Sequence, residues 1–232
     1  MNGYSDSFAV ILAGCGRADG TEITEAVSVL IALSKLGAEY RCFAPDRVQR
    51  EVVDHRSGAV VAGATRNCLT EAARIARGAI EPLEVLRAAD FAGVIFPGGF
   101  GAAKNLCDFA ARGAAMTVAP DVERILCEFH GARKPIGLCC IAPILAAKVF
   151  GSTHVEITLG AKGPASAAAE SWGARHIVKR VDQAHADTTQ RVVTAPAYMD
   201  DAATPNEVYL GIEAMVRTVV EMAEVSPRLA AR

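Results

Sequence analysis

Three short, unbroken apolar runs, at residues 8–13, 93–96 and 136–139, constrain the fold of this 232-residue chain more than any other feature. A strand that is apolar at every position is buried on both faces, as in the centre of a parallel sheet covered by helices. Each run ends in a turn, and a stretch with apolar residues at helical spacing follows. The pattern predicts an α/β fold, a three-layer α/β/α sandwich around a mostly parallel sheet.

The remaining elements alternate in the same way. Further strands are predicted at 39–43, 155–159 and 191–194, with a small edge hairpin within 50–62. Helices are predicted at 23–36, 67–76, 82–88, 102–112, 120–131, 143–150, 165–172 and 206–224. Neither an internal repeat nor a long linker interrupts this order, so we expect a single domain over residues 1–232.

Composition and charge exclude several classes of function. Hydrophobic residues make up 51% of the chain, which is enough for one large core, and the formal net charge is −2. Basic residues are scattered among acidic ones, so a nucleic-acid partner is not expected. No apolar run reaches the roughly 18–20 residues that span a bilayer. The start of the chain has no basic region before its apolar run, so we expect neither a membrane partner nor a signal peptide.

The cysteines indicate a reducing compartment. They lie at positions 15, 42, 68, 107, 127, 139 and 140, an odd number without a Cys-x-x-Cys pair. Disulfides and a structural zinc site are therefore disfavoured, and we expect a cytoplasmic protein without a metal. The glycine-rich turns match neither the phosphate-loop nor the dinucleotide-binding pattern, and no cofactor is expected.

Three turns should meet at one site. In open parallel sheets, binding sites form beyond the carboxyl ends of the strands. The turns at 14–25, 97–101 and 139–143 each follow a predicted strand. We therefore expect them to converge on one crevice.

The segment 134–143, KPIGLCCIAP, carries two cysteines where a buried strand turns sharply into a helix. A nucleophile at such an elbow is lifted clear of the backbone. The free N–H groups and the positive dipole end of the following helix favour a thiolate, so the pKa of the nucleophile should fall. Gly137, two positions earlier, favours Cys139 as that nucleophile, whereas a helix start at Pro143 favours Cys140.

Several segments together resemble the ElbB-like branch of the ThiJ/PfpI superfamily, which has a class I glutamine amidotransferase-like, flavodoxin-like fold. They are GCGRADGTEITEA, CFAPD, PGGFGAAKNL, GLCCIAP and VVTAPAYM, and they extend from the first strand to about Met199. In this family the nucleophile is the last cysteine before an x-Ala-Pro or x-Gly-Pro step. The resemblance therefore implies that Cys140 is the nucleophile and that Cys139 is an inward-pointing strand residue.

The resemblance also implies a glutamate near the start of the first helix, in contact with the cysteine sulfur. Glu22 lies three residues after Asp19, an arrangement close to a capping box, so Glu22 has a structural role of its own. Counting back from Gly37 at the helix end, Glu25 matches the family glutamate and is favoured over Glu22. A carboxyl partly buried beside sulfur should be protonated and donate a hydrogen bond to the thiolate.

An oxyanion site is implied at the glycine turn 97–101. Gly98 and Gly99 lie in this turn, and the N–H groups of Gly99 and Ile141 are the favoured donors. Asn105 follows the turn and Tyr198 follows a late strand, so both could border the crevice. The hydroxyl of Tyr198 could donate a hydrogen bond there.

The elbow lacks a histidine, and this changes the expected chemistry. Many members of the superfamily carry histidine directly after the cysteine as a general base, but Ile141 occupies that position here. Among the histidines, at 55, 130, 154, 176 and 185, only His154 is close to the elbow helix in sequence. Peptide hydrolysis needs an acid for its poor leaving group, so an amidotransferase-like hydrolase is the least favoured function.

Two functions remain. The resemblance implies a glyoxalase that uses neither metal nor glutathione and converts a small dicarbonyl substrate, glyoxal, to glycolate through a hemithioacetal on Cys140. The alternative is a non-enzymatic, redox-sensing or regulatory protein whose oxidised Cys140 is stabilised by Glu25 and the helix N-terminus. Because relatives are commonly dimers, a homodimer is expected.

Overall fold

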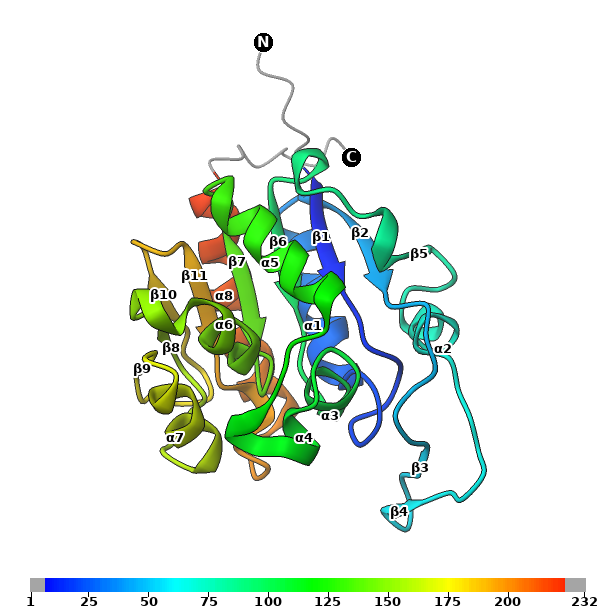
Figure 1. The fold of residues 1–232 in the computed structure, drawn as a ribbon. Coiled ribbons are helices and arrows are strands. Elements are labelled where there is room, and N and C mark those ends of the chain that lie inside the picture. Colours follow the sequence, from blue (N-terminus) through cyan, green and yellow to red (C-terminus); the bar gives the residue numbers. More distant parts are fainter. Residues whose placement is uncertain (1–6, 224–232) are drawn as a thin grey trace.

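The central sheet has seven strands in the order β10-β11-β7-β6-β1-β2-β5 (Figure 1). The computed structural model describes residues 7–223. Only β10 runs antiparallel to its neighbour, so the sheet is mostly parallel, as predicted. The strands are β1 (Ser7–Ile11), β2 (Glu39–Ala44), β5 (Ile80–Pro82), β6 (Gly93–Phe96), β7 (Ile136–Cys139), β10 (His185–Asp187) and β11 (Val192–Ala195).

Helices cover both faces of this sheet and confirm the three layers (Figure 1). One face is covered by α1 (Ile23–Lys35), α2 (Cys68–Ile75) and α8 (Pro205–Met222). The other is covered by α5 (Pro120–Gly131) and α6 (Pro143–Phe150), and α7 (Pro164–Ser171) packs against α6. The short helices α3 (Phe100–Lys104) and α4 (Phe109–Arg112) follow β6. Within residues 7–223, no helix is long and apolar enough to cross a membrane.

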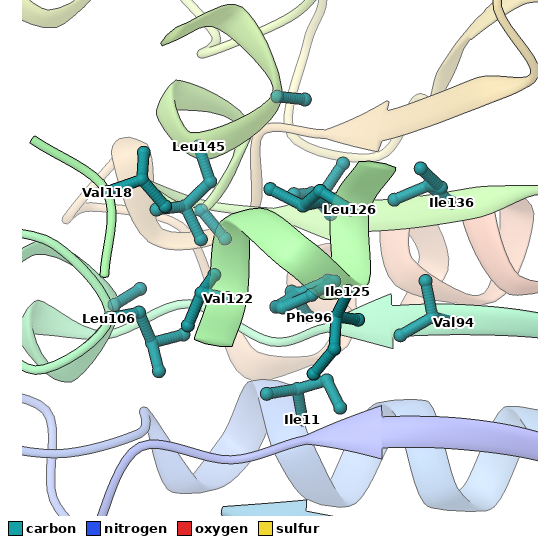
Figure 2. Close-up of a cluster of buried hydrophobic side chains, with 14 of the residues drawn as sticks. Ile11, Val94, Phe96, Leu106, Val118, Val122, Ile125, Leu126, Ile136 and Leu145 are labelled. Atoms are coloured by element: carbon teal, nitrogen blue, oxygen red, sulfur yellow. The ribbon is translucent and has the colours of Figure 1, made fainter. Parts of the chain in front are cut away.

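Helix α5 illustrates how the apolar spacing produces the layers. Pro120 occupies its first turn, where the missing N–H is not needed. Its apolar residues recur at helical spacing and face the sheet, and Figure 2 shows Ile125 among buried residues that include Phe96. The side chains buried along this face are Val122, Ile125, Leu126 and Phe129.

Some elements differ from the prediction. The predicted strand at 155–159 is only β8 (Glu156–Ile157), which pairs with β9 (Arg175–His176) outside the main sheet. The predicted helix at 82–88 is wrong, because the chain forms the end of edge strand β5 there and continues in short 3-10 turns at Leu83–Val85 and Ala88–Asp90. Proline is tolerated at such a sheet edge, where Pro82 ends β5.

The predicted edge hairpin is present as β3 (Val53–Asp54) and β4 (Ala59–Val60). It forms a separate two-stranded sheet beyond the carboxyl end of β2 (Figure 1). The remaining short elements are 3-10 turns at Gly113–Ala115, Gly151–Thr153 and Ala197–Met199.

The order of the strands determines where a site can form. After β1 the chain continues to β2 on one side, and it later returns to β6 on the other side of β1. Such a switch point leaves a crevice beyond the carboxyl ends of the two strands. The turns after β1, β6 and β7 border this crevice, and they are the turns that the sequence analysis singled out.

Replacing Ile125 by alanine should lower the free energy of unfolding by about 2–5 kcal/mol, because the fully buried side chain leaves a cavity. Chemical denaturation followed by circular dichroism measures this. Cys127→Ala, on the exposed face of the same helix, serves as the control and should change stability by less than about 0.5 kcal/mol. Equal effects of the two substitutions would contradict the assigned packing of α5.

Candidate active site

Cys140 lies at a sharp turn between β7 and α6. The strand ends at Cys139, the N–H of Cys140 donates to the carbonyl of Ala195 at 3.0 Å, and the helix begins at Pro143. Cys140 has a φ of +59°, in the left-handed region that costs a residue with a side chain roughly 1–3 kcal/mol. The predicted elbow is therefore present, and the strain is concentrated at the second of the two cysteines.

The two cysteines have different surroundings. Cys140 is 7% exposed and lines a cavity of about 260 Å³. Cys139 is fully buried and does not line that cavity. The structure therefore opens Cys140 to a ligand and directs Cys139 into the interior, in agreement with the choice that the resemblance implied.

Glu25 lies in the first turn of α1, and its side chain is completely buried. Its Oε2 accepts a hydrogen bond from the N–H of Gly98 at 3.0 Å, and its Oε1 accepts one from the N–H of Tyr198 at 3.2 Å. The thiol of Cys139 donates to Oε2 at 3.9 Å, and the carboxyl also lies beside the sulfur of Cys140, with which it interacts. Of the two glutamates that the sequence offered, Glu25 is thus the one that contacts the cysteine sulfur.

Glu22 has a different role from the one predicted. It is itself the N-cap of α1, and its Oε2 accepts the N–H of Glu25 at 2.7 Å. The predicted cap, Asp19, instead turns into the neighbouring segment, where its Oδ2 accepts the N–H of Val53 at 2.7 Å. The helix therefore starts one turn later than the Asp19 motif suggested, which places Glu25 at the N3 position.

Burial controls the protonation of this pair. Burial, followed by repulsion from the Glu22 carboxylate, raises the pKa of Glu25 to about 8, and the hydrogen bonds from Tyr198, Cys140 and Gly98 only partly oppose it. A protonated carboxyl at neutral pH agrees with the sequence argument. The predicted fall in the pKa of Cys140 is wrong, because burial and then the Glu25 carboxylate raise the pKa of its thiol well above the ordinary value.

The glycine turn after β6 brings backbone N–H groups to the sulfur. The N–H groups of Gly99 and Ile141, the predicted oxyanion donors, both act on Cys140 in the direction that favours its thiolate, although burial outweighs them. Gly98 lies between the two reactive side chains, since a Cβ added there would be 2.4 Å from Cys140 Cβ and 2.7 Å from Glu25 Oε2. Only glycine fits at this position.

The three turns converge as predicted. The N–H of Phe100 donates to the carbonyl of Arg17 at 2.7 Å, and that of Glu22 donates to the carbonyl of Gly98 at 3.0 Å. Gly99 has a φ of +90°, and a Cβ there would lie 2.3 Å from the nitrogen of Glu22. These contacts join the turn after β1 to the turn after β6, beside the elbow after β7.

The wall of the cavity includes residues that the sequence analysis did not single out. Tyr198 lines it, but its contact with Glu25 is made by its backbone N–H and not by its hydroxyl. Asn105 does not line it, because its amide joins the turn after β1, at Ala13 and Asp19, to the segment at Arg50. The lining residues that were missed are Arg17, Phe100, Ala103, Phe109, Ala110, Met199 and Asp201. Their nearness to the predicted turns in sequence was the only available signal.

None of the histidines, all of which lie within residues 7–223, lines the cavity. His154 bonds the carbonyl of Gly173 through Nδ1, and His185 bonds Glu156 through Nε2 at 3.1 Å. A histidine–glutamate pair therefore exists, but away from Cys140. Among the described residues, no group of three or more His, Cys, Asp or Glu side chains is arranged to hold a metal ion.

The raised pKa of Glu25 predicts a specific dependence of stability on pH. The folded protein keeps a proton on Glu25 that the unfolded chain releases near its ordinary pKa of 4.5. The stability that this proton contributes is complete below that value and is lost as the pH rises towards about 8. The glutamine in Glu25→Gln stays neutral at every pH. The free energy of unfolding of this variant, minus that of the natural protein, should therefore increase by roughly 3 kcal/mol from pH 5 to pH 8.

Urea denaturation at several pH values measures this difference, in which contributions from other groups cancel. Glu123→Gln, on the exposed side of α5, is the matched control. Its curve of unfolding free energy against pH should run parallel to that of the natural protein. Parallel curves for Glu25→Gln as well would show that Glu25 is ionised in the folded state.

Comparison with known proteins identifies close relatives. Glutamine amidotransferase-like class 1 domain-containing protein 3, mitochondrial, from Homo sapiens is 52% identical over 223 residues, which cover 92% of this chain and 82% of the relative. The ES1 protein, mitochondrial, from Danio rerio is 36% identical, with coverage of 95% and 87%. No family model matches the sequence.

Solved structures agree with this relationship. An isoprenoid biosynthesis protein with an amidotransferase-like domain from Ehrlichia chaffeensis superposes with a TM-score of 0.86 at 35% identity, covering 93% of this chain and 98% of the other. DJ-1beta from Drosophila melanogaster shares the fold with a TM-score of 0.53 at 16% identity, covering 97% and 92%. The chain therefore belongs to the family of the ES1 proteins and of glutamine amidotransferase-like class 1 domain-containing protein 3, and it has the ThiJ/PfpI fold.

Proposed function

We propose that this protein is a glyoxalase of the ElbB-like type that converts glyoxal to glycolate without a cofactor. The observation that carries the proposal is the completely buried Glu25, which lies beside the Cys140 sulfur and has a pKa raised to about 8. The reaction needs one nucleophile and one group that accepts and returns protons. Cys140 and Glu25 can supply both, and no histidine is required.

A carboxyl with a pKa near the working pH is suited to this task. An ordinary carboxylate is a weak base, whereas a group with a pKa of about 8 both accepts and donates protons readily near neutral pH. Cys140 and Glu25 are coupled, so the reactive form is the one in which the pair shares a single proton. That proton can lie on sulfur or on the carboxyl, and the hydrogen bond joins the two states.

The first step forms a carbon–sulfur bond. The sulfur of Cys140 adds to one aldehyde carbon of glyoxal while the proton of the thiol passes to Glu25. The developing oxyanion is stabilised by the N–H groups of Gly99 and Ile141, which flank the sulfur. Such donors can contribute about 2.7–4 kcal/mol each. Protonation of that oxygen by Glu25 gives the hemithioacetal.

The second step is an internal transfer of hydrogen, and it needs no oxidant. Glu25 takes the proton from the carbon that carries sulfur and returns it to the neighbouring carbonyl carbon. The hydroxyl proton of the hemithioacetal passes to the oxygen of that carbonyl, and the product is a thioester of glycolate. Water then attacks the thioester, the carbon–sulfur bond breaks, and Cys140 recovers its proton. The sum is glyoxal plus water to glycolic acid, so atoms and electrons balance.

The resemblance of the glycine turn and the elbow to ElbB-like proteins supports this proposal. The names of the relatives contain ES1, amidotransferase-like and isoprenoid biosynthesis, and none contains glyoxalase. A cytoplasmic location and a homodimer also stay predictions, and the relatives from Homo sapiens and Danio rerio carry the word mitochondrial in their names.

Incubation with glyoxal tests the proposal directly. We expect the natural protein to produce glycolate in a metal-chelated buffer, measured by chromatography. Cys140→Ala should abolish production, and Glu25→Gln should lower kcat by about 10²–10⁴-fold because the proton carrier is lost. Cys42→Ala, which removes a buried thiol of β2 that does not line the cavity, is the matched control and should retain activity. Production by Cys140→Ala at the rate of the natural protein would refute the proposal.

A non-enzymatic, oxidation-responsive role is the second candidate. The two N–H groups at the Cys140 sulfur and the carboxyl of Glu25 could also hold the oxygens of a sulfenic or sulfinic acid. This role ranks second because oxidation needs a free thiolate, which the raised pKa of the Cys140 thiol disfavours, whereas addition to an aldehyde can pass the thiol proton directly to Glu25.

Mild peroxide followed by peptide mass spectrometry distinguishes the candidates. A redox role predicts selective oxidation of Cys140 ahead of the exposed Cys127. Oxidation of Cys127 first, with Cys140 still reduced, would count against it.

A further inference from the structure

We propose that the cavity over Cys140 binds an uncharged 2-oxoaldehyde with a compact apolar arm, such as an aryl or branched alkyl group, and that α3 and α4 form the subsite for this arm. That the ligand is a dicarbonyl rests on the proposed function. That it carries an apolar arm rests on the size and the lining of the cavity.

The size of the cavity is the first observation. Its volume of about 260 Å³ equals roughly nine water molecules, at about 30 Å³ each in the liquid. Glyoxal has four non-hydrogen atoms and fills roughly the space of two or three waters. Most of the cavity would stay unfilled by glyoxal, so the walls have room for a further group attached to the dicarbonyl.

The chemistry of the walls indicates what that group is. Helix α3 contributes Phe100 and Ala103, helix α4 contributes Phe109 and Ala110, and the elbow contributes Ile141. None of these side chains has a polar atom, so together they suit an apolar group. Phe100 is 46% exposed although it is large and aromatic, so covering it with a ligand would remove apolar surface from water.

The apolar wall is held in place. The N–H of Phe100 is fixed to the carbonyl of Arg17 at 2.7 Å. The ring of Phe109 packs edge-on against Trp172, with the ring centroids 6.3 Å apart and an interplanar angle of 77°. A pocket that is already formed loses little free energy in ordering when a ligand binds.

The charges at the cavity disfavour an anionic arm. Its charged lining residues within the described part of the chain are Arg17, Glu22 and Asp201. Arg17 already faces Asp201, with 3.9 Å between Nη1 and Oδ1. The remaining carboxyl, on Glu22, would repel a carboxylate or phosphate on the substrate. An uncharged arm is therefore the one that fits.

Alkylation of Cys140 tests the arm subsite independently of turnover. The intact protein is treated with iodoacetamide, N-phenyl-iodoacetamide or iodoacetate, and mass spectrometry reads the rate at Cys140. Each rate is divided by the rate of the same reagent with a small free thiol. We expect the phenyl reagent to be favoured about tenfold over iodoacetamide, because its ring is buried in the cavity, and iodoacetate to be disfavoured.

Two substitutions on α4 make the test specific. Ala110 is exposed and lines the cavity, whereas its neighbour Ala111 is exposed and does not. Ala110→Phe should fill the subsite and remove most of the preference for the phenyl reagent. Ala111→Phe adds the same ring outside the cavity and should preserve the preference.

The outcomes separate this inference from the proposed function. A preference that disappears in Ala110→Phe but not in Ala111→Phe supports the subsite, even if no dicarbonyl is turned over. Equal normalised rates for the three reagents, or equal behaviour of the two variants, would overturn it, even if glyoxal is converted to glycolate. Where turnover is present, a higher kcat/KM for phenylglyoxal than for its 4-carboxy derivative supports the uncharged arm, and the reverse order overturns it.

Discussion

The position of the buried Glu25 carboxyl beside the Cys140 sulfur is the constraint on which the rest of the site depends. A carboxyl without access to water is tolerable only when it is neutral or well bonded. Here both conditions hold, because burial raises the pKa of Glu25 to about 8 and the N–H groups of Gly98 and Tyr198 reach its two oxygens. Three loops from distant parts of the sequence are thereby tied to one side chain.

Close approach of these loops is possible only because glycine stands where they touch. An added Cβ at Gly98 would overlap Cys140, and one at Gly99 would overlap the backbone before α1. The same closeness brings the N–H of Gly99 near the Cys140 sulfur, on which the N–H of Ile141 also acts. The glycine turn therefore determines both the depth of burial of the pair and the donors available to it.

The chemistry follows from a proton that moves between two neighbouring groups. Without a histidine in the cavity, Glu25 is the buried carboxyl in contact with the nucleophile, and its raised pKa suits it to proton transfer near neutral pH. Amide hydrolysis gains little from such a pair, because a leaving amine needs its own acid. Isomerisation of a dicarbonyl needs only short proton transfers around one sulfur-bound carbon.

The sequence by itself determined the layers of the fold and the segments that form the site. Unbroken apolar runs such as 136–139, each followed by a turn, predicted buried strands and placed the glycine turns at their ends. Short edge elements such as β10 carry too weak a pattern to be predicted, and periodicity alone could not distinguish the end of β5 from a helix. Only the tertiary structure decided that Cys140 opens to the cavity, that Glu22 and not Asp19 caps α1, and that the Cys140 thiol has a raised pKa. The physical reason is that burial and contact between distant loops set these properties, and neither is a property of local sequence.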